Sequence, residues 1–398
     1  MRAYFQTFPC SKGDCIFLRL VEGEERFNIM IDCGKFDPAI RSYVENECSG
    51  RIDLLIVTHY DTDHIEGITA MLNEMPDLGV RNILFNTYKR NPNKASEALP
   101  NVLKQRVKDL GKKMPTVVVE DIISHKISAK HAITLSETLL KNERWNTIWC
   151  KERITKTSPN IQLGADSKFG ELVFLSPTEA ALEDLDKEYK KYFLQVMNIK
   201  QDVDYDDNEN LYEMLIRIFV NGLEAKKPTA SKIAYTSISD NTDLNVYASE
   251  PLMPMTKSNK ASIAFVWQKG EHRILFMGDA DPSVVSDGLR EKFNLHDNRL
   301  VLDAIKISHH GSKDSTNQEI LNLIDTDKFF ITGGEKEKRP HINTLSRIIM
   351  SNDDRQKTIY VNTPNETTKG IAKANGLKAR YLYSVILNPN DCKYEFEV

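Results

Sequence analysis

The chain has 398 residues, of which 40% are hydrophobic and 28% are charged. This length predicts one large domain with an insertion, or two domains. The 53 basic and 57 acidic residues give a net charge of -4, which excludes a protein that holds nucleic acid by overall charge alone. The composition also excludes a disordered or fibrous chain.

The sequence also excludes a membrane-spanning protein and a protein stabilised by disulfide bonds. The apolar runs at 54–57 and 263–267 are far shorter than the ~18 residues of a membrane span, and Met1 opens on a strand-like pattern rather than a signal peptide. We therefore expect a cytoplasmic protein with no membrane partner. The six cysteines show no CxxC spacing, so we expect reduced, mostly buried thiols. Any metal must then be held by histidines and carboxylates.

The first third of the chain predicts a meander followed by alternating helices and strands. Short β-prone runs at 3–8, 15–20 and 27–31 are separated by turn-forming segments. Helical patterns at 38–48 and 65–75 flank the apolar run at 54–57, which we interpret as a strand buried on both faces.

The composition changes between 177 and 232, where we predict a helical insertion within a domain that spans 1–398. An amphipathic helix starts at Glu179, an acidic loop follows at 202–210, and an apolar helix occupies 211–220. The loop lacks the glycine and the terminal glutamate of an EF-hand, which favours a solvated linker over a calcium site. The amphipathic helices fit a cover for an active site, a surface for a protein partner, or self-association.

Strand patterns return at 261–267, 273–277, 304–307 and 328–331, each followed by a polar loop. Two similar α/β halves with an insertion describe this order most simply.

The strongest chemical signal lies at 57–67, between the buried strand and the next helix. His59, Asp61, Asp63 and His64 crowd this turn, and imidazole and carboxylate are ligands of zinc, manganese and iron. Because histidine and aspartate alternate along this turn, two of the four side chains can bind one metal ion and the other two a second metal ion. The alternative is a helix N-terminus capped by Asp63 with solvated histidines, but four ligands within six positions favour metal binding.

Two later strand ends carry similar groups. Asp279 follows an apolar strand and Gly278, although an aspartate in a turn at this place is common. His309 and His310 follow another strand, and because adjacent side chains point in different directions we expect only one of them to be a ligand.

These segments, in this order, resemble the metallo-β-lactamase-fold hydrolases. The resemblance rests on 31–34, on the His59–His64 turn, on Gly278 with Asp279, and on 308–312. It is closest to the ComEC-like branch, named after a DNA-uptake competence protein, whose opening strand resembles 12–18 and whose run before the Gly-Asp pair resembles 257–265. The resemblance covers the chain apart from the insertion.

The resemblance implies an α/β fold, a four-layer αββα sandwich with two metals at one edge. By position, His59 and Asp61 would bind one metal and Asp63 and His64 the second. Asp279 would bridge the two, His309 would complete the second site with His310 as the rival, and Asp32 would orient a ligand.

The chain departs from the commoner pattern at the first metal. Histidine usually stands where this chain has Asp61, and a further histidine often comes from a later loop. His125 and His131 lie in that interval, but neither follows a clear strand end, so we assign neither. We therefore expect the first site to bind its metal more weakly, or to prefer a harder ion than zinc. We expect two divalent ions, Zn²⁺ first and Mn²⁺, Fe²⁺ or Mg²⁺ as alternatives.

We expect catalytic roles for Asp63, His310 and His341. His341 opens a helix after Pro340, where it would contact a phosphate or protonate a leaving group; a surface position is an equal alternative. Lys313 would attract an anion or be solvated. We interpret His272 and His296 as surface residues.

Two metals that share a water lower its pKa toward ~7 and supply hydroxide at neutral pH. The sequence shows neither a Ser-His-Asp arrangement nor a P-loop. The first hypothesis is a metal-dependent phosphodiesterase or nuclease acting on nucleic acid or a nucleotide ester. The second is a hydrolase of a small ester, lactone or amide. The third is a metal-binding effector or scaffold without turnover.

Overall fold

The computed structural model describes residues 1–10, 13–86, 135, 138–139, 142–150, 152–196, 237–296, 298–334, 338–351 and 355–398. The acidic loop and the second helix of the expected insertion lie outside the described residues, as do His125 and His131.

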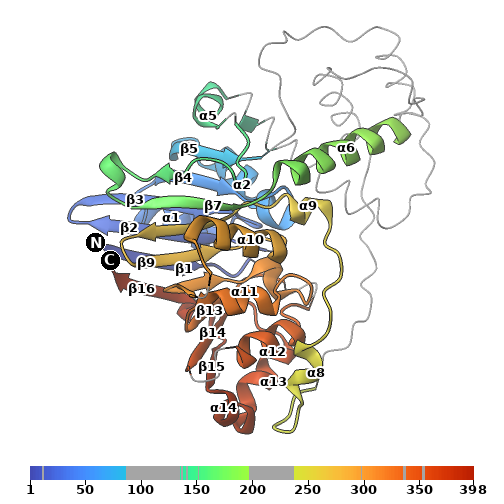
Figure 1. Cartoon of the computed structure of the whole chain (residues 1–398). Helices are drawn as coiled ribbons and strands as arrows, with labels where there is room; N and C mark the ends of the chain where they lie inside the picture. Colours follow the sequence, from blue (N-terminus) through green and yellow to red (C-terminus); the bar gives the residue numbers. More distant parts are fainter. Residues whose placement is uncertain are drawn as a thin grey trace.

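A six-stranded sheet contains the N-terminal part of the chain, in the order β16-β1-β2-β3-β4-β5. Its strands are β1 (Arg2–Thr7), β2 (Ile16–Glu22), β3 (Glu25–Ile31), β4 (Arg51–Val57), β5 (Gly79–Phe85) and β16 (Lys393–Glu397). The first three pair antiparallel, as the meander pattern predicted, and β3, β4 and β5 are parallel. Because the last strand pairs with β1, the two termini lie side by side (Figure 1).

An eight-stranded sheet follows the order β15-β14-β13-β11-β9-β8-β7-β6. Its strands are β6 (Ile161–Gln162), β7 (Glu171–Ser176), β8 (Ala264–Lys269), β9 (His272–Phe276), β11 (Ala304–Lys306), β13 (Lys328–Ile331), β14 (Lys357–Val361) and β15 (Tyr383–Ile386). Strands β6 to β9 pair antiparallel, whereas β9, β11, β13, β14 and β15 are parallel. A separate two-stranded sheet joins β10 (Leu300–Val301) to β12 (Ile324–Asp325).

The two large sheets pack face to face through an apolar core. Phe5 on β1 meets Phe330 on β13 at 4.4 Å between ring centroids and Phe276 on β9 at 5.6 Å. Trp267 is fully buried in the same cluster. Alternate residues of each strand point into this core, which follows from the two-residue period of a strand.

Helices cover the outer face of each sheet. The first sheet carries α1 (Pro38–Asn46), α2 (Thr62–Glu74) and α5 (Glu143–Ile148), and the second carries α10 (Pro282–Phe293), α11 (Gln318–Leu323), α12 (Ile342–Met350), α13 (Glu366–Lys373) and α14 (Asn375–Tyr381). Figure 1 shows α10, α11 and α12 in front of the second sheet. The expected αββα sandwich is confirmed.

Helix α6 (Glu179–Val196) follows β7 and extends away from the sandwich in Figure 1. Its first turns stay attached, because Leu182 and Leu185 are buried against the first half. The 177–232 boundaries of the insertion remain a prediction. No helix among the described residues combines the length and the apolar character of a membrane span.

Two short helices, α8 (Leu244–Ala248) and α9 (Lys257–Lys260), lead from residue 237 back to β8. Helix α8 lies against α12 (Figure 1), where Arg347 donates to the carbonyls of Ala248 and Glu250. The segment is thereby held on the second half before it reaches the strand edge described below.

Candidate metal centre

The carboxyl ends of parallel strands from both sheets converge at one edge of the sandwich. Residues that follow strand ends in an α/β sheet are directed at this edge, where ligands usually bind. Here the edge collects Asp32 after β3, His59 after β4, Asp279 after β9 and His309 after β11. Helix α2 begins one turn beyond β4 and adds its own first residues.

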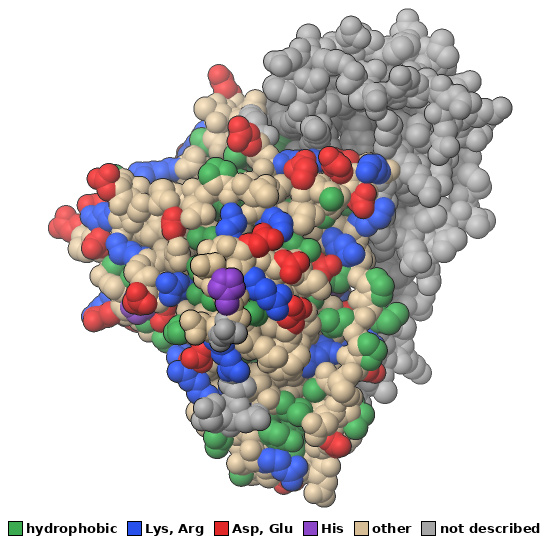
Figure 2. Space-filling view, in the orientation of Figure 1, with side chains coloured by type: hydrophobic (Ala, Val, Ile, Leu, Met, Phe, Trp, Pro, Cys, Tyr) green, Lys and Arg blue, Asp and Glu red, His purple; other side chains and the backbone are tan. Residues whose placement is uncertain are grey.

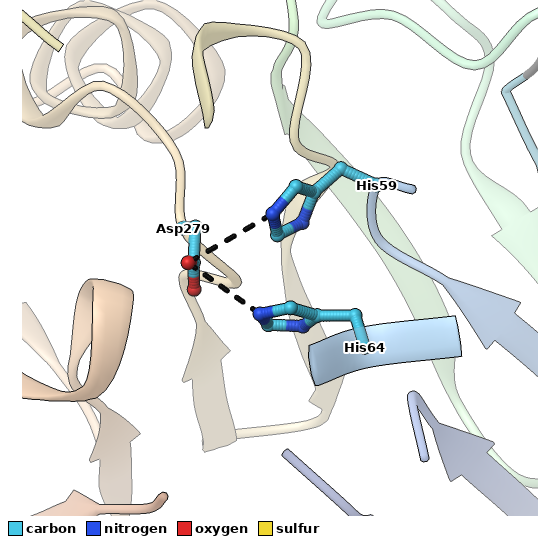
Figure 3. A group of neighbouring side chains, drawn as sticks. All are labelled: His59, His64 and Asp279. Carbon is cyan, nitrogen blue, oxygen red and sulfur yellow. Dashed lines mark ion pairs between the residues drawn. The ribbon is translucent and has the colours of Figure 1, made fainter. Parts of the chain in front are cut away.

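Asp279 is the centre of the group. Its Oδ2 lies 3.4 Å from His64 Nε2, 3.5 Å from His309 Nε2, 3.8 Å from His59 Nε2 and 3.9 Å from His310 Nε2. Figure 3 shows that His59 and His64 turn their rings toward this carboxylate from one side. Four imidazoles from two segments therefore face one oxygen, and both His309 and His310 are among them, although we expected only one of that pair.

Asp32 orients two of these rings from below. It accepts hydrogen bonds from the Thr58 backbone N–H and hydroxyl, both at 2.7 Å, and its Oδ2 is 2.8 Å from His64 Nδ1. His59 Nδ1 is 3.1 Å from the Thr58 hydroxyl oxygen. Because that hydroxyl donates to Asp32, the network assigns an Nδ1 proton to both rings and turns both Nε2 atoms toward the centre.

His309 and His310 both reach the centre, but in different settings. Each has a positive φ, +50° and +55°, in the short helix Ser308–Gly311. His310 is fully buried, its Nδ1 is 2.8 Å from the carbonyl of Thr332, and its Nε2 is 3.1 Å from Asp63 Oδ2. His309 Nδ1 lies 3.1 Å from the Ser315 hydroxyl.

Two further carboxylates flank the centre. Asp61 Oδ2 is 3.5 Å from His59 Nε2, and Asp63 Oδ2 is 3.9 Å from His64 Nε2. Asp61 is the N-cap residue of α2 but makes no capping hydrogen bond with its side chain. Its Oδ1 accepts instead from the Ser258 hydroxyl at 2.6 Å. The Asp61 side chain therefore points to the site and does not cap the helix. This argues against the alternative that the motif is only a helix N-terminus.

Charge interactions shift the pKa values of these groups strongly. Burial opposes charge on every one of them, yet the neighbouring carboxylates outweigh it and raise the pKa of His64 well above its usual value and that of His310 to about 10. Against the same burial, the imidazoles lower the pKa of Asp61, Asp63 and Asp279. His309 differs, because its burial prevails and lowers its pKa to about 3.

The donor set fits divalent metal ions. Among the described residues, His59 Nε2, His64 Nε2 and Asp279 Oδ1 are buried and form no hydrogen bond. The potential ligand atoms of His59, His64 and Asp279 lie within 4.8 Å of one another, as do those of Asp63, His64 and His310. Buried polar atoms of this kind are costly unless a partner satisfies them. Imidazole and carboxylate together suit zinc, manganese or iron.

His341 is the N-cap residue of α12, and its backbone N–H donates to the carbonyl of Gly311, next to His310, at 3.0 Å. The backbone N–H of Lys313 donates to its Nδ1 at 3.0 Å, which leaves the ring proton on Nε2. Burial and the charge of Arg339 lower the pKa of His341 to about 4. The same guanidinium also acts to lower the pKa of His309, so this cation stands near both rings.

Of the two histidines expected at the surface, His296 is exposed, whereas His272 is less exposed than expected. His272 is partly buried and pairs with Asp303 at 3.1 Å. All six cysteines are free, and five are buried.

Sequence reasoning assigned no role to several residues that contact the site. Ser258 and Asn259 come from α9; Asn259 Nδ2 lies 3.2 Å from His309 Nδ1. The Ser262 hydroxyl accepts from the Asp279 N–H at 3.0 Å. Asp14 and Lys306 lie beneath the centre. The sequence did contain one signal for this pair, because Lys306 is a charged residue within an otherwise apolar strand.

Three glycines allow the loops to approach one another. A Cβ added to Gly13 or Gly34 would lie 1.7 Å or 2.1 Å from the carbonyl oxygen of Asp63. Gly278 has φ +50°, and its Cβ would meet the Ser262 hydroxyl at 2.5 Å. The turn that carries Asp63 is therefore enclosed by backbone on two sides.

No family model matches the chain, and no curated protein matches it. Solved structures do match across nearly its whole length, at low identity. A mutant of CmlA beta-hydroxylase is 10% identical with a TM-score of 0.39; the match covers 98% of this chain and 54% of that one. A diphosphatase from the PhnP family is 8% identical with a TM-score of 0.38, covering 100% and 98%. The metallo-beta-lactamase fold protein YhfI from Bacillus subtilis is 8% identical with a TM-score of 0.35, covering 99% of both.

Proposed function

We propose that this protein is a metal-dependent hydrolase that cleaves phosphodiesters, in nucleic acid or in a nucleotide ester. The observation that carries the proposal is the single carboxylate oxygen of Asp279 faced by four imidazole nitrogens at 3.4 to 3.9 Å. Asp61 and Asp63 flank that group and supply the anionic charge that divalent cations balance.

His59, Asp61 and Asp279 would hold one ion, and Asp63, His64, Asp279 and one imidazole of the 309–310 pair the second. Two such ions, when bound, activate water and stabilise negative charge on the reacting group. The catalytic role that we expect for Asp63 would be exercised at this position, where its Oδ2 lies 3.1 Å from His310 Nε2. Asp32 orients the ring of His64 directly and the ring of His59 through the Thr58 hydroxyl.

Cationic and neutral donors beside the centre favour an anionic substrate over a neutral ester. Arg339 stands near His309 and His341, and Lys313 follows the His310 loop. With its pKa lowered to about 4, His341 is neutral at pH 7 and offers an Nε2 proton as a hydrogen bond. Of the two roles expected for it, contact with a phosphate oxygen is therefore favoured over protonation of a leaving group.

The balance of basic and acidic residues argues for local recognition of the substrate. On the face shown in Figure 2, basic and acidic side chains are interspersed, without a broad patch of one sign. This agrees with the net charge of -4. A nucleic-acid substrate would then be held by a few phosphate contacts near the metals, and its affinity would depend only modestly on salt.

The test is hydrolysis by the metal-loaded protein. We expect cleavage of bis-p-nitrophenyl phosphate, and of single-stranded DNA or RNA, after loading with Mn²⁺ or Zn²⁺. Asp279→Asn should lower the rate at least roughly a hundredfold and lower the metal content, with an unchanged circular dichroism spectrum. Elemental analysis of the same samples measures the ions bound per chain.

Asp281→Asn is the matched control. Asp281 caps α10 through the Ser283 N–H at 3.0 Å and pairs with Lys260 at 3.9 Å, and asparagine caps helices equally well. We expect nearly full activity from it. Cleavage of a β-lactam alone would instead establish hydrolysis of a small amide, and fewer than one ion per chain without turnover would establish the scaffold hypothesis.

A further inference from the structure

A buried lysine lies directly beneath the candidate metal centre. Lys306 is the last residue of β11, in the eight-stranded sheet, and is 1% exposed. Its ammonium forms an ion pair with the carboxylate of Asp14, which precedes β2 in the other sheet and is also 1% exposed. The pair therefore connects the two sheets at the edge where the metal ligands converge.

The same ammonium binds the turn that carries Asp279. Lys306 Nζ donates to the carbonyl of Gly278 at 3.0 Å and lies 4.0 Å from Asp279 Oδ1. The Gly278 carbonyl also accepts the backbone N–H of His309 at 3.0 Å. One carbonyl thus fastens the Asp279 turn to the His309 turn, and Lys306 holds that carbonyl in place.

Asp14 extends the link to His310. Its Oδ1 accepts a hydrogen bond from the Thr332 hydroxyl and lies 3.3 Å from His310 Nδ1. The Thr332 carbonyl in turn is 2.8 Å from the same ring nitrogen. The backbone of the neighbouring Gly13 packs against the Asp63 carbonyl, where even a Cβ would not fit. Asp14 is therefore in contact with the loops that present two of the site's side chains.

The backbone at these turns needs external support. Gly278, His309 and His310 have φ values of +50°, +50° and +55°. For the two histidines this left-handed conformation is unfavourable, because the Cβ approaches the following carbonyl oxygen. It persists only where surrounding contacts determine it, and the Lys306–Gly278–His309 connection is such a contact.

The lysine also supplies charge that the centre needs. Asp14, Asp32, Asp61, Asp63 and Asp279 contribute five carboxylates to this region. One internal ammonium reduces their formal charge from -5 to -4, which two divalent cations balance. A full set of five carboxylates without the ammonium would leave one negative charge unmatched in a buried setting.

We propose that Lys306, together with Asp14, is a positioning pair that pre-organises the metal centre by holding the Asp279, His309 and His310 turns in their binding geometry. The inference rests on the proposed metal site and adds to it two residues that are not among its proposed ligands. Partners of this kind, one shell out from the ligands, typically change metal affinity by 10–100-fold when removed.

The effect on metal binding can be separated from the effect on folding. Removing one partner of a buried ion pair leaves an uncompensated charge and destabilises a fold, whereas replacing both by neutral groups is often nearly neutral. The double variant Asp14→Asn with Lys306→Met should therefore fold with about the thermal stability of the wild type in EDTA. Lys306→Met alone should melt at a lower temperature.

Metal affinity is the decisive measurement. Competition with a chromogenic chelator for Mn²⁺ or Zn²⁺ should show affinity at least tenfold weaker in the double variant than in the wild type. The visible spectrum of the Co²⁺-loaded double variant should also differ in its d–d bands, because the ligands are no longer held in the same geometry. Neither readout requires catalytic activity.

Lys357→Met is the matched control. Lys357 is also fully buried and donates to a backbone carbonyl, that of Ser351 at 2.7 Å, but it lies on β14 away from the centre. We expect this variant to lose thermal stability while keeping wild-type metal affinity and Co²⁺ spectrum. Thr332→Val, which removes one donor to Asp14 without unpairing a charge, should weaken affinity severalfold and serves if the double variant does not fold.

A folded double variant with wild-type affinity, ion count and Co²⁺ spectrum would overturn the positioning role while leaving the proposed function intact. Unchanged affinity in Thr332→Val when the double variant is unfolded would overturn it as well. A wild-type protein that binds no divalent ion would instead overturn the proposed function and this inference together.

Discussion

At the scale of residues, the site depends on which nitrogen or oxygen each side chain turns toward Asp279. His59 and His64 are oriented by one carboxylate, Asp32, although they come from different elements. A metal-ligating histidine usually donates its second ring N–H to a carboxylate or a backbone carbonyl. His64 does so to Asp32, and His310 does so to the Thr332 carbonyl.

This criterion distinguishes His309 from His310. The resemblance implied that His309 completes the second site, with His310 as the rival. His310 is buried, anchored by Thr332, and grouped with Asp63 and His64 within 4.8 Å. We therefore expect His310→Ala to lower metal affinity roughly 100-fold and His309→Ala about tenfold or less, measured by chelator competition. His272→Ala, which removes a histidine from a pair with Asp303, is the control. A larger loss in His309→Ala would restore the first assignment.

At the scale of elements, the site is built by turns that fit together without space for side chains. Helix α2 begins directly at the metal motif, so its first turn and the β4 strand end form one rigid unit. Gly34 and Gly13 allow two other loops to close over the Asp63 carbonyl. The helix start cannot shift without moving Asp63 and His64 with it.

We predict that Gly34→Ala displaces this unit. The new Cβ would lie 2.1 Å from the Asp63 carbonyl oxygen, and such overpacking costs about 1–3 kcal/mol of unfolding free energy. Urea denaturation should show that loss, and elemental analysis should show a lowered metal content. Gly23→Ala is the control, because that glycine has φ +62° but nothing within 4 Å. It should show backbone strain alone and bind metal normally; equal metal content in both variants would contradict the prediction.

At the scale of the whole molecule, the centre lies between the two sheets, so its charge affects global stability. In the folded chain the pKa of His310 is raised to about 10 and that of His64 is raised as well, against ~6.5 in an unfolded chain. Their contribution to stability is complete below pH ~6.5 and is lost as the pH rises toward 10. The lowered pKa values of Asp61, Asp63 and Asp279 act oppositely, and their contribution is lost as the pH falls below ~3.9.

We therefore predict that the metal-free protein is most stable near pH ~6.5. Stability falls above that pH as His64 and His310 lose their protons, and below it because the buried His309 and His341, with pKa values of about 3 and about 4, resist protonation. Metal binding requires neutral imidazoles, releases protons and so strengthens with pH. The difference in Tm between metal-loaded and EDTA-treated protein should widen by several degrees from pH 6.5 to 9, as measured by differential scanning calorimetry. His310→Ala should flatten the decline in the metal-free samples. A difference that narrows with rising pH would contradict the assignment.

The sequence alone determined the order of the elements and the identity of most candidate ligands. Periodicity predicted the opening meander and the strand ends of β4, β9 and β11, because alternation and apolar runs depend on local burial. The crowding of His59, Asp61, Asp63 and His64 indicated a metal site for the same local reason. The resemblance then implied the αββα arrangement, which the packing of the two sheets confirms.

Only the tertiary structure decided which distant residues meet. Asp14 and Lys306 are 292 positions apart, and their pairing follows from two sheets packing face to face, which no local pattern encodes. The return of β16 to β1, the contact of Ser258 with Asp61, and the burial of His310 beside Asp63 have the same origin. Long-range pairs form when the apolar core closes, and the hydrophobic effect that closes it carries no direction of its own. The local sequence therefore determines which ligand groups are available, whereas the packing of the fold determines where those groups lie relative to one another.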